Sequence, residues 1–208
     1  MICSELFGAH GVTGLFTEGG PNLAEDMGAL KTWMLSKMAW DLSLATDWEK
    51  LMDEFLTGYY GKASKQMRAY MEIMHAAAIR TGDPVKMFES SNQVLVNKTL
   101  MKYATAPTLL RAGSALRAAK SSVTDHALHL SHVEVAELPT LYVVLPIFKQ
   151  VLSYARAHAL AWPFASENLH VLLNDFVRVF NTTGDAMVDI HHSLDAFVAL
   201  VRSNYVRA

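Results

Sequence analysis

The sequence has little cysteine, little excess charge of either sign, and no long apolar run. Cys3 is the single cysteine among 208 residues, so the chain holds no disulfide framework and no zinc site built on cysteines. The formal net charge of −2 gives no electrostatic attraction to nucleic acid or anionic lipid. No apolar run reaches transmembrane length, and the N-terminus lacks the basic-then-apolar order of a signal peptide. We therefore expect neither nucleic acid nor a membrane as partner, and leave localisation open.

Common cofactor motifs, repeats and linkers are missing as well. Gly19 and Gly20 are not followed by the Lys-Ser/Thr pair of a phosphate-binding loop. The sequence shows no internal repeat, low-complexity tract or flexible linker. Apolar residues make up 51% and charged residues 18%, which argues for a folded protein with a large core. We expect no cofactor and no metal.

The stretch from 28 to 75 predicts three helices joined by short breaks. In the first, Leu30, Trp33 and Met34 begin an apolar stripe at helical spacing. The segment Thr46–Glu49 has the Thr-x-x-Glu pattern of a capping box, which predicts the start of the second helix. Gly58–Gly61 interrupts the pattern before an amphipathic run begins at 63.

The remaining sequence also favours helices, with start and stop signals of its own. A helix capped by Asn22 is expected to reach Trp40, and the run from 63 is expected to stop near Thr81. Thr105 followed by Pro107 predicts a further helix start. Three more helical segments are expected over Asp125–Ala161, kinked or split at Pro139 and Pro146, over Ser166–Phe180 and over Ser193–Val206. Segment 85–103 gives no clear pattern.

One short segment, Val12–Phe16, has the small–large alternation of a buried strand and ends at Glu18–Pro21. With the helix that follows, it predicts one unit of an alternating barrel or doubly wound sheet. A lone parallel strand leaves its backbone polar groups unpaired, and no other segment favours a strand. The predicted strand therefore requires partners that this sequence does not provide.

Three blocks, His10–Gly19, Lys31–Asp41 and Asp53–Gly61, together resemble an uncharacterised bacterial family. Its members have a glycoside-hydrolase-type (β/α) barrel followed by a helical domain, similar in layout to α-glucuronidases and β-hexosaminidases. The resemblance continues through weaker blocks, which begin at Ala104, Val133 and Ser193.

This resemblance implies that Val12–Phe16 is the last barrel strand, so that residues 1–45 are the end of a barrel and 46–208 a helical domain. The expected fold is mainly α, a bundle-like domain preceded by a single βα unit. Seven barrel strands are missing, together with the positions of the usual acid and base. Glu18, at the C-terminal end of the strand, is the one candidate for contact with a sugar, and no catalytic residue is assigned.

Other candidate sites compete with ordinary structural roles. His126, His129 and His132 recur at i, i+3 and i+6, a spacing open to zinc, but solvated or hydrogen-bonded histidines on a helix are the favoured explanation. Neighbouring His191 and His192 point in different directions. Packing wedges at helix junctions are favoured over a sugar-stacking platform for the aromatics Trp40, Tyr59 and Tyr60. Core packing is favoured over an adaptable binding surface for the methionines Met34, Met38, Met52 and Met71, which lie on apolar stripes.

Two functions remain open on these observations. The first is a C-terminal helical support region of a glycoside-hydrolase-like, carbohydrate-active protein, not catalytic on its own and exported in the intact family. The second is a stand-alone helical interaction or oligomerisation protein without enzymatic activity. The expected partners are carbohydrate in the intact homologue, the missing barrel domain, or a second copy of the chain.

Overall fold

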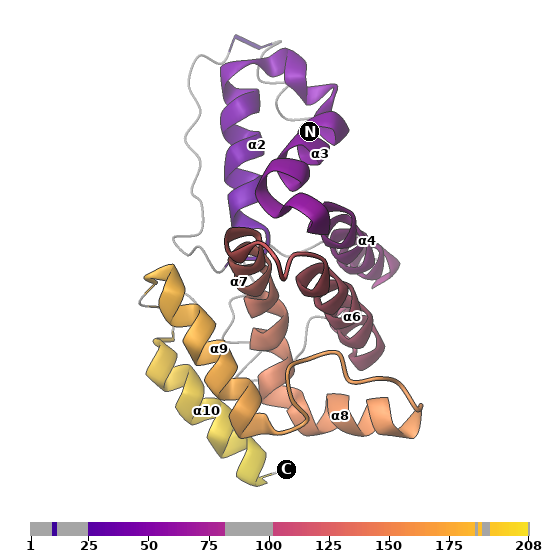
Figure 1. Cartoon of the computed structure of the whole chain (residues 1–208), viewed down its shortest axis with the longest axis vertical. Helices are drawn as coiled ribbons and strands as arrows, with labels where there is room; N and C mark the ends of the chain where they lie inside the picture. Colours follow the sequence, from indigo (N-terminus) through magenta and orange to yellow (C-terminus); the bar gives the residue numbers. More distant parts are fainter. Residues whose placement is uncertain (1–9, 12–24, 82–101, 186, 189–191, 208) are drawn as a thin grey trace.

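The computed structural model describes residues 10–11, 25–81, 102–185, 187–188 and 192–207, which form a succession of helices (Figure 1). The α-helices are α2 (Gly28–Trp40), α3 (Trp48–Tyr60), α4 (Ser64–Thr81), α6 (Ala106–Ser122), α7 (Ala127–Val144), α8 (Phe148–Ala157), α9 (Leu169–Thr183) and α10 (Leu194–Arg207). Short 3-10 turns, η1 (Leu42–Ala45), η2 (Gly61–Ala63) and η3 (Leu145–Ile147), join three successive pairs.

The expected mainly α fold is confirmed, whereas the described residues give no support to a βα unit. Their β pairing is limited to one isolated antiparallel bridge between Met187 and Ser193. The predicted strand Val12–Phe16 lies outside the described residues. The helix expected to follow it ends at Trp40 as predicted, but it begins at Gly28, because residues 25–27 form a turn in which Met27 has a left-handed conformation (φ 52°).

Two predicted N-caps are wrong. The Thr46 hydroxyl donates to the carbonyl of Ser43 (2.8 Å) at the end of η1, so it does not cap α3, which follows Asp47. The helix expected to start at Ser166 starts after Asn168, whose side-chain oxygen accepts from the backbone N–H groups of His170 and Val171. Thr105 and Ser193 do stand at the N-caps where the sequence places them.

The two prolines of the 125–161 segment act differently. Pro139 lies inside α7 without ending it. Pro146 marks the break, because η3 separates α7 from α8, and α8 ends at Ala157. A proline at the first or second position of a helical turn loses no intrahelical hydrogen bond, which explains its place in η3.

Two hydrophobic cores lie one above the other along the molecule. The upper core is built by α2, α3, α4 and parts of α6 and α7, and includes Leu30, Leu56, Tyr70 and Leu116. The lower core is built by the other parts of α6 and α7 together with α8, α9 and α10, and includes Phe176. Figure 1 shows α2 and α3 side by side above, α4 beside α6, and α7 between α6 and α9, in agreement with their packing contacts.

Helix α7 is the central element and the most apolar of the described helices. By length and composition, Ala127–Ala157 could cross a membrane, contrary to the expectation that no such run exists, and 56% of its most apolar window is buried inside the protein. A helix that is apolar all round is found in the middle of a helical core as well as in membranes. Its neighbours α3, α6 and α9 account for that burial here.

Candidate functional site

A cavity of about 320 Å³ lies where the two cores meet, and we call it the Asp26 pocket. Its described lining comes from the turn before α2, from α4, from the start of α6 and from α7, α9 and the 187–188 segment. The lining residues are Glu25, Asp26, Tyr70, Met74, Tyr103, Ala104, Leu109, Leu138, Pro139, Thr140, Tyr142, Val143, Phe176, Phe180 and Val188.

The polar side of the Asp26 pocket is a short hydrogen-bond chain. The Tyr70 hydroxyl donates to the Asp26 carboxylate (Oη–Oδ1 2.9 Å), and the Thr140 hydroxyl lies 3.4 Å from the Tyr70 hydroxyl and donates to it. Tyr70 is 1% exposed. Burial, followed by the negative charge of Asp26, raises the pKa of Tyr70 well above its ordinary value of 10.0. Tyr70 is therefore a neutral donor that fixes the orientation of the Asp26 carboxylate.

The negative charge of Asp26 also contributes to raised pKa values of two other tyrosines near the site. Burial and then Asp26 raise the pKa of Tyr103, which also lines the pocket. Burial, then Tyr59, then Asp26 raise the pKa of Tyr60. The neighbouring Glu25 is paired with Lys31 at 3.3 Å. The pocket thus has a negative end surrounded by tyrosines.

Most of the remaining described lining of the pocket is apolar. Leu109 and Leu138 are fully buried there, one on α6 and one on α7. Phe176 and Phe180, at i and i+4 on α9, present rings 6.0 Å apart in a stacked arrangement. The site therefore combines one carboxylate end with a large hydrophobic surface, the usual composition of small-molecule pockets.

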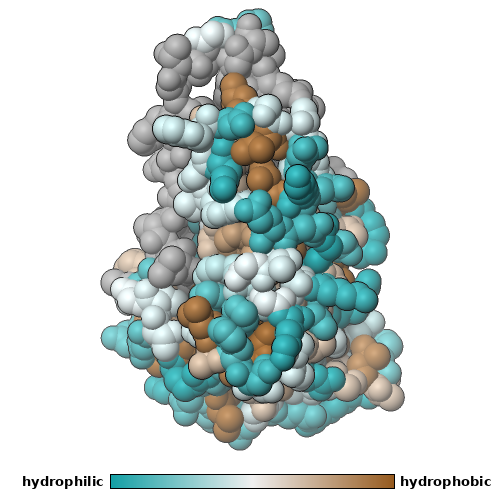
Figure 2. All heavy atoms as spheres, turned by 45° about the horizontal axis from the view of Figure 1, so that its top comes forward, coloured by the Kyte–Doolittle hydropathy of each residue, from teal (hydrophilic) through white to brown (hydrophobic). Residues whose placement is uncertain are grey.

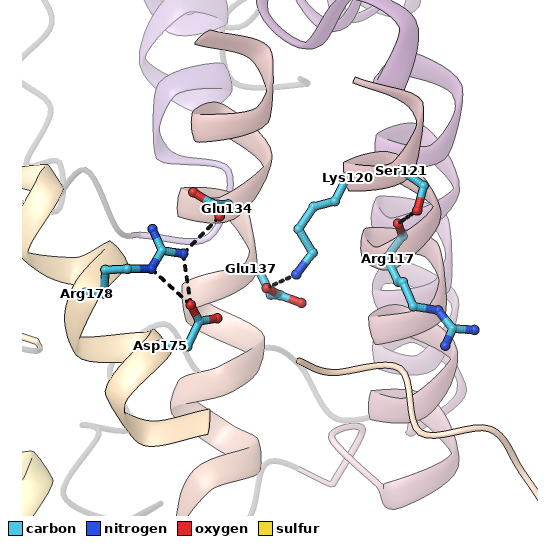
Figure 3. Close-up of polar contacts among 7 residues, drawn as sticks. All are labelled: Arg117, Lys120, Ser121, Glu134, Glu137, Asp175 and Arg178. Atoms are coloured by element: carbon cyan, nitrogen blue, oxygen red, sulfur yellow. Dashed lines mark hydrogen bonds and ion pairs between the residues drawn. The ribbon is translucent and has the colours of Figure 1, made fainter. Parts of the chain in front are cut away.

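A second polar cluster joins α6, α7 and α9 (Figure 3). Lys120 on α6 pairs with Glu137 on α7 at 2.6 Å, and Glu137 is 4% exposed with its Oε1 unpartnered. Burial raises the pKa of Glu137 above its ordinary value of 4.5, against the opposing charge of Lys120. Arg178 on α9 binds Glu134 and Asp175, both at 2.9 Å. These pairs connect three helices and leave each carboxylate opposite a cation, an arrangement suited to structural support.

The predicted histidine cluster is a packing feature. His132 stacks on Tyr59 (3.7 Å, 5°) and its Nδ1 lies 2.7 Å from the Tyr59 carbonyl oxygen. His126 stacks on His129 and its Nδ1 accepts from the His129 backbone N–H. Within the described residues, no three His, Cys, Asp or Glu side chains are grouped to hold a metal ion. The hydrogen-bonded interpretation explains these residues.

The aromatic candidates do not form one platform. Trp40 is 94% exposed at the end of α2, whereas Tyr60 is 3% exposed in the upper core. Tyr59 packs edge-on against Tyr60 with ring centroids 5.0 Å apart, as a packing wedge would. Among the methionines, Met52 is buried and Met34 and Met71 pack against the same core; Met38 is half-buried.

Two predicted positions cannot be compared with the structure. Glu18, the one candidate sugar contact, and His191 both lie outside the described residues. His192 is described and half-buried. The assignment of Glu18 therefore stays a prediction.

Sequence reasoning missed the residues that form both polar sites. Glu137 could have been found, because it lies four residues from Val133 and from Leu141, which are both buried on α7. A charged residue on the buried stripe of an apolar helix needs a partner. Asp26 gives no such signal, since it precedes α2 and contacts Tyr70 only through the tertiary fold.

Comparison with known proteins gives one match, which covers about a third of the chain. Residues 4–72 match DUF4838, a domain of unknown function. The DUF4838 match covers α2, α3 and the first half of α4, and it contains the blocks His10–Gly19, Lys31–Asp41 and Asp53–Gly61 that carry the resemblance described above. The weaker blocks from Ala104 onward lie outside it. No curated protein and no solved structure matches the chain.

Proposed function

We propose that this chain is the helical support region of a glycoside-hydrolase-like, carbohydrate-active protein and is not catalytic on its own. One observation carries the proposal. Helix α2 belongs to the block that resembles the end of a barrel, yet its buried residue Leu30 and the preceding Met27 lie in the same core as Met52 and Val133 of the later helices. A barrel end joined in this way would have a rigid helical base.

The pairing of three carboxylates on α7 and α9 with cations supports a non-catalytic role. A glycosidase usually places two carboxyl groups about 5 to 10 Å apart across the scissile bond. Here Glu137 is paired with Lys120, and Glu134 and Asp175 share Arg178. On this proposal the acid and base come from a barrel, and Glu18 contacts the sugar in the intact protein.

The proposal is tested by activity and by gene context. We expect the 208-residue chain to show no turnover of aryl glycosides or aryl uronides, and an in-frame barrel to be encoded upstream of Met1. Hydrolysis that disappears in Glu18→Gln would contradict the non-catalytic role. A ribosome-binding site directly before Met1, with no barrel upstream, would contradict the support role.

A stand-alone interaction protein is the second candidate, favoured by exposed apolar side chains where α2 meets η1. Trp40 and Leu42 are 94% and 42% exposed there, and Leu35, earlier on α2, is 37% exposed. Figure 2 shows apolar side chains reaching the surface in the upper part of the molecule, between hydrophilic ones. Exposed apolar groups that lie close together are typical of interfaces.

Light scattering tests this alternative on the purified chain. If the corner between α2 and η1 is an interface, the chain self-associates and Trp40→Lys restores the monomer. Ile79→Lys, at a 66% exposed position on α4, is the matched control and leaves the assembly intact. A monomeric wild-type chain would remove the basis for this second function.

A further inference from the structure

Within the part of the chain that the structure describes, no cation is paired with the carboxylate of the Asp26 pocket. The hydrogen-bond partner of the Asp26 carboxylate is the neutral Tyr70 hydroxyl, and no ion pair joins Asp26 to a Lys, Arg or His among the described residues. Lys31, the basic side chain closest in sequence, pairs with Glu25. A negative charge beside an apolar cavity is costly unless something positive comes near it.

The chemistry of the described walls disfavours two classes of ligand. An anion would meet Asp26 and Glu25 at the polar end. A free sugar would turn several hydroxyls towards Leu138, Phe176 and Phe180, which offer no hydrogen-bond partner, and each unpaired hydroxyl is unfavourable. Only one end of a suitable ligand should be polar, and that end should be positive.

We propose that the Asp26 pocket binds a small organic cation, an ammonium group carried on an apolar body. The ammonium group would lie beside the Asp26 carboxylate and the phenol rings of Tyr70 and Tyr103, and the apolar body along Leu138 and the Phe176–Phe180 pair. Carboxylate and aromatic ring together are the groups that recognise ammonium ions, through charge pairing and the negative face of the ring.

The volume of the cavity and the negative potential near Asp26 agree with this ligand class. The cavity of about 320 Å³ is at the small end of the range for ligand sites, roughly 300 to 1,000 Å³, so it suits a compact amine. The raised pKa values of Tyr70 and Tyr103, caused by burial and then by Asp26, reflect a negative potential at the same end of the pocket. This inference goes beyond the support role and does not depend on it.

The experiment titrates the full chain with two probes of nearly equal shape, benzylamine and benzyl alcohol, by isothermal titration calorimetry. We expect benzylamine to bind and benzyl alcohol to bind at least about tenfold more weakly. Asp26→Asn keeps an oxygen that can accept from Tyr70 and removes the charge, so benzylamine affinity falls at least about tenfold. Asp47→Asn makes the same charge change at an exposed position before α3 and leaves the affinity unchanged.

A second variant tests the cavity without changing any charge. Ala104, 2% exposed, lines the pocket, so a folded Ala104→Leu fills part of it and abolishes benzylamine binding. The proposal is overturned if benzylamine does not bind, if benzyl alcohol binds as tightly, or if folded Asp26→Asn or Ala104→Leu binds benzylamine like the wild type. The titration involves no hydrolysis, so its result is separate from that of the glycoside assays.

Discussion

At the scale of single residues, the ion pair of Lys120 and the buried Glu137 should be strongly destabilising to break. Lys120→Met leaves a buried carboxylate without its cation and should lower the free energy of unfolding by about 3–5 kcal/mol. Lys120→Met with Glu137→Leu replaces both charges by apolar groups of similar length and should return the free energy of unfolding to the wild-type value or raise it by up to about 4 kcal/mol. Urea unfolding of the wild type, Lys120→Met, Glu137→Leu and the double variant completes this double-mutant cycle.

A double variant as unstable as Lys120→Met would contradict this account. It would mean that the Glu137 side chain contributes something besides its charge, such as a hydrogen bond that its Oε1 accepts from water.

The same carboxylate predicts a pH dependence with a definite sign. Because burial raises the pKa of Glu137 above 4.5 in the folded protein, that state binds more protons than the unfolded chain at pH values between the two pKa values. Wild-type stability, measured relative to Glu137→Gln, therefore falls as pH rises through the window that begins at 4.5. Urea unfolding of both proteins from about pH 4 to pH 8 tests it. A difference that rises with pH would show that Lys120 outweighs burial.

Gly61 is a position where a side chain cannot be accommodated. Its φ is +54°, and a Cβ there would lie 2.3 Å from Nδ1 of His129. Gly61→Ala should therefore destabilise the protein by about 1–3 kcal/mol from backbone strain alone, with the contact adding to it. Gly58→Ala is the matched control, since Gly58 lies inside α3 with open space around it, and should stabilise by about 0.5–1 kcal/mol. Thermal unfolding compares them, and equal effects would exclude the contact with His129.

At the scale of elements, the N-termini of α3 and α9 allow a test of the caps predicted from the sequence against those seen in the structure. Asn168 caps two backbone N–H groups of α9, so Asn168→Ala should cost about 1 kcal/mol of stability. Thr46→Ala should cost less, because the Thr46 hydroxyl donates to Ser43 and caps no N–H group of α3. Chemical denaturation of the two variants measures the difference. A larger loss in Thr46→Ala would restore the capping box that the sequence predicts.

Periodicity made most helices predictable, whereas caps depended on local competition. The apolar positions Leu51, Met52, Phe55 and Leu56 recur at helical spacing and are all buried, as expected. The Thr46 and Ser166 hydroxyls were plausible caps by residue type. Each instead joins the hydrogen bonds of the preceding turn or loop: the Thr46 hydroxyl donates to the Ser43 carbonyl, and the Ser166 hydroxyl accepts from the Asn168 N–H. Such choices between neighbouring polar residues are not visible in a pattern of apolar spacing.

The Asp26 pocket was not predictable for a different reason. Asp26 and Tyr70 are separated by 44 residues, and Tyr70 and Thr140 by 70. Tyr70 fits the apolar stripe of α4, so the sequence explains its burial and gives no reason to expect a polar partner. Contacts between residues so far apart in the sequence arise when helices pack, and a single sequence does not show which residues will meet.

At the scale of the whole molecule, α6 and α7 belong to both cores. Leu116 and Val133 lie in the upper core, and Leu110 and Leu141 in the lower one. Because neither core is complete without these two helices, we expect a single cooperative thermal transition, with calorimetric and van't Hoff enthalpies equal. Differential scanning calorimetry measures both. Two resolved transitions would show that the cores unfold independently.

This sharing also sets an order of events during synthesis on the ribosome. The upper core contains Met27 and Leu30 but is completed only by Val133 and Ala136, so α2, α3 and α4 leave the ribosome well before the residues that cover them. At about 5–20 residues per second, their apolar faces stay open for several seconds of translation. A chaperone that binds nascent chains has its target in that interval, and codons that slow translation between α4 and α7 would lengthen it.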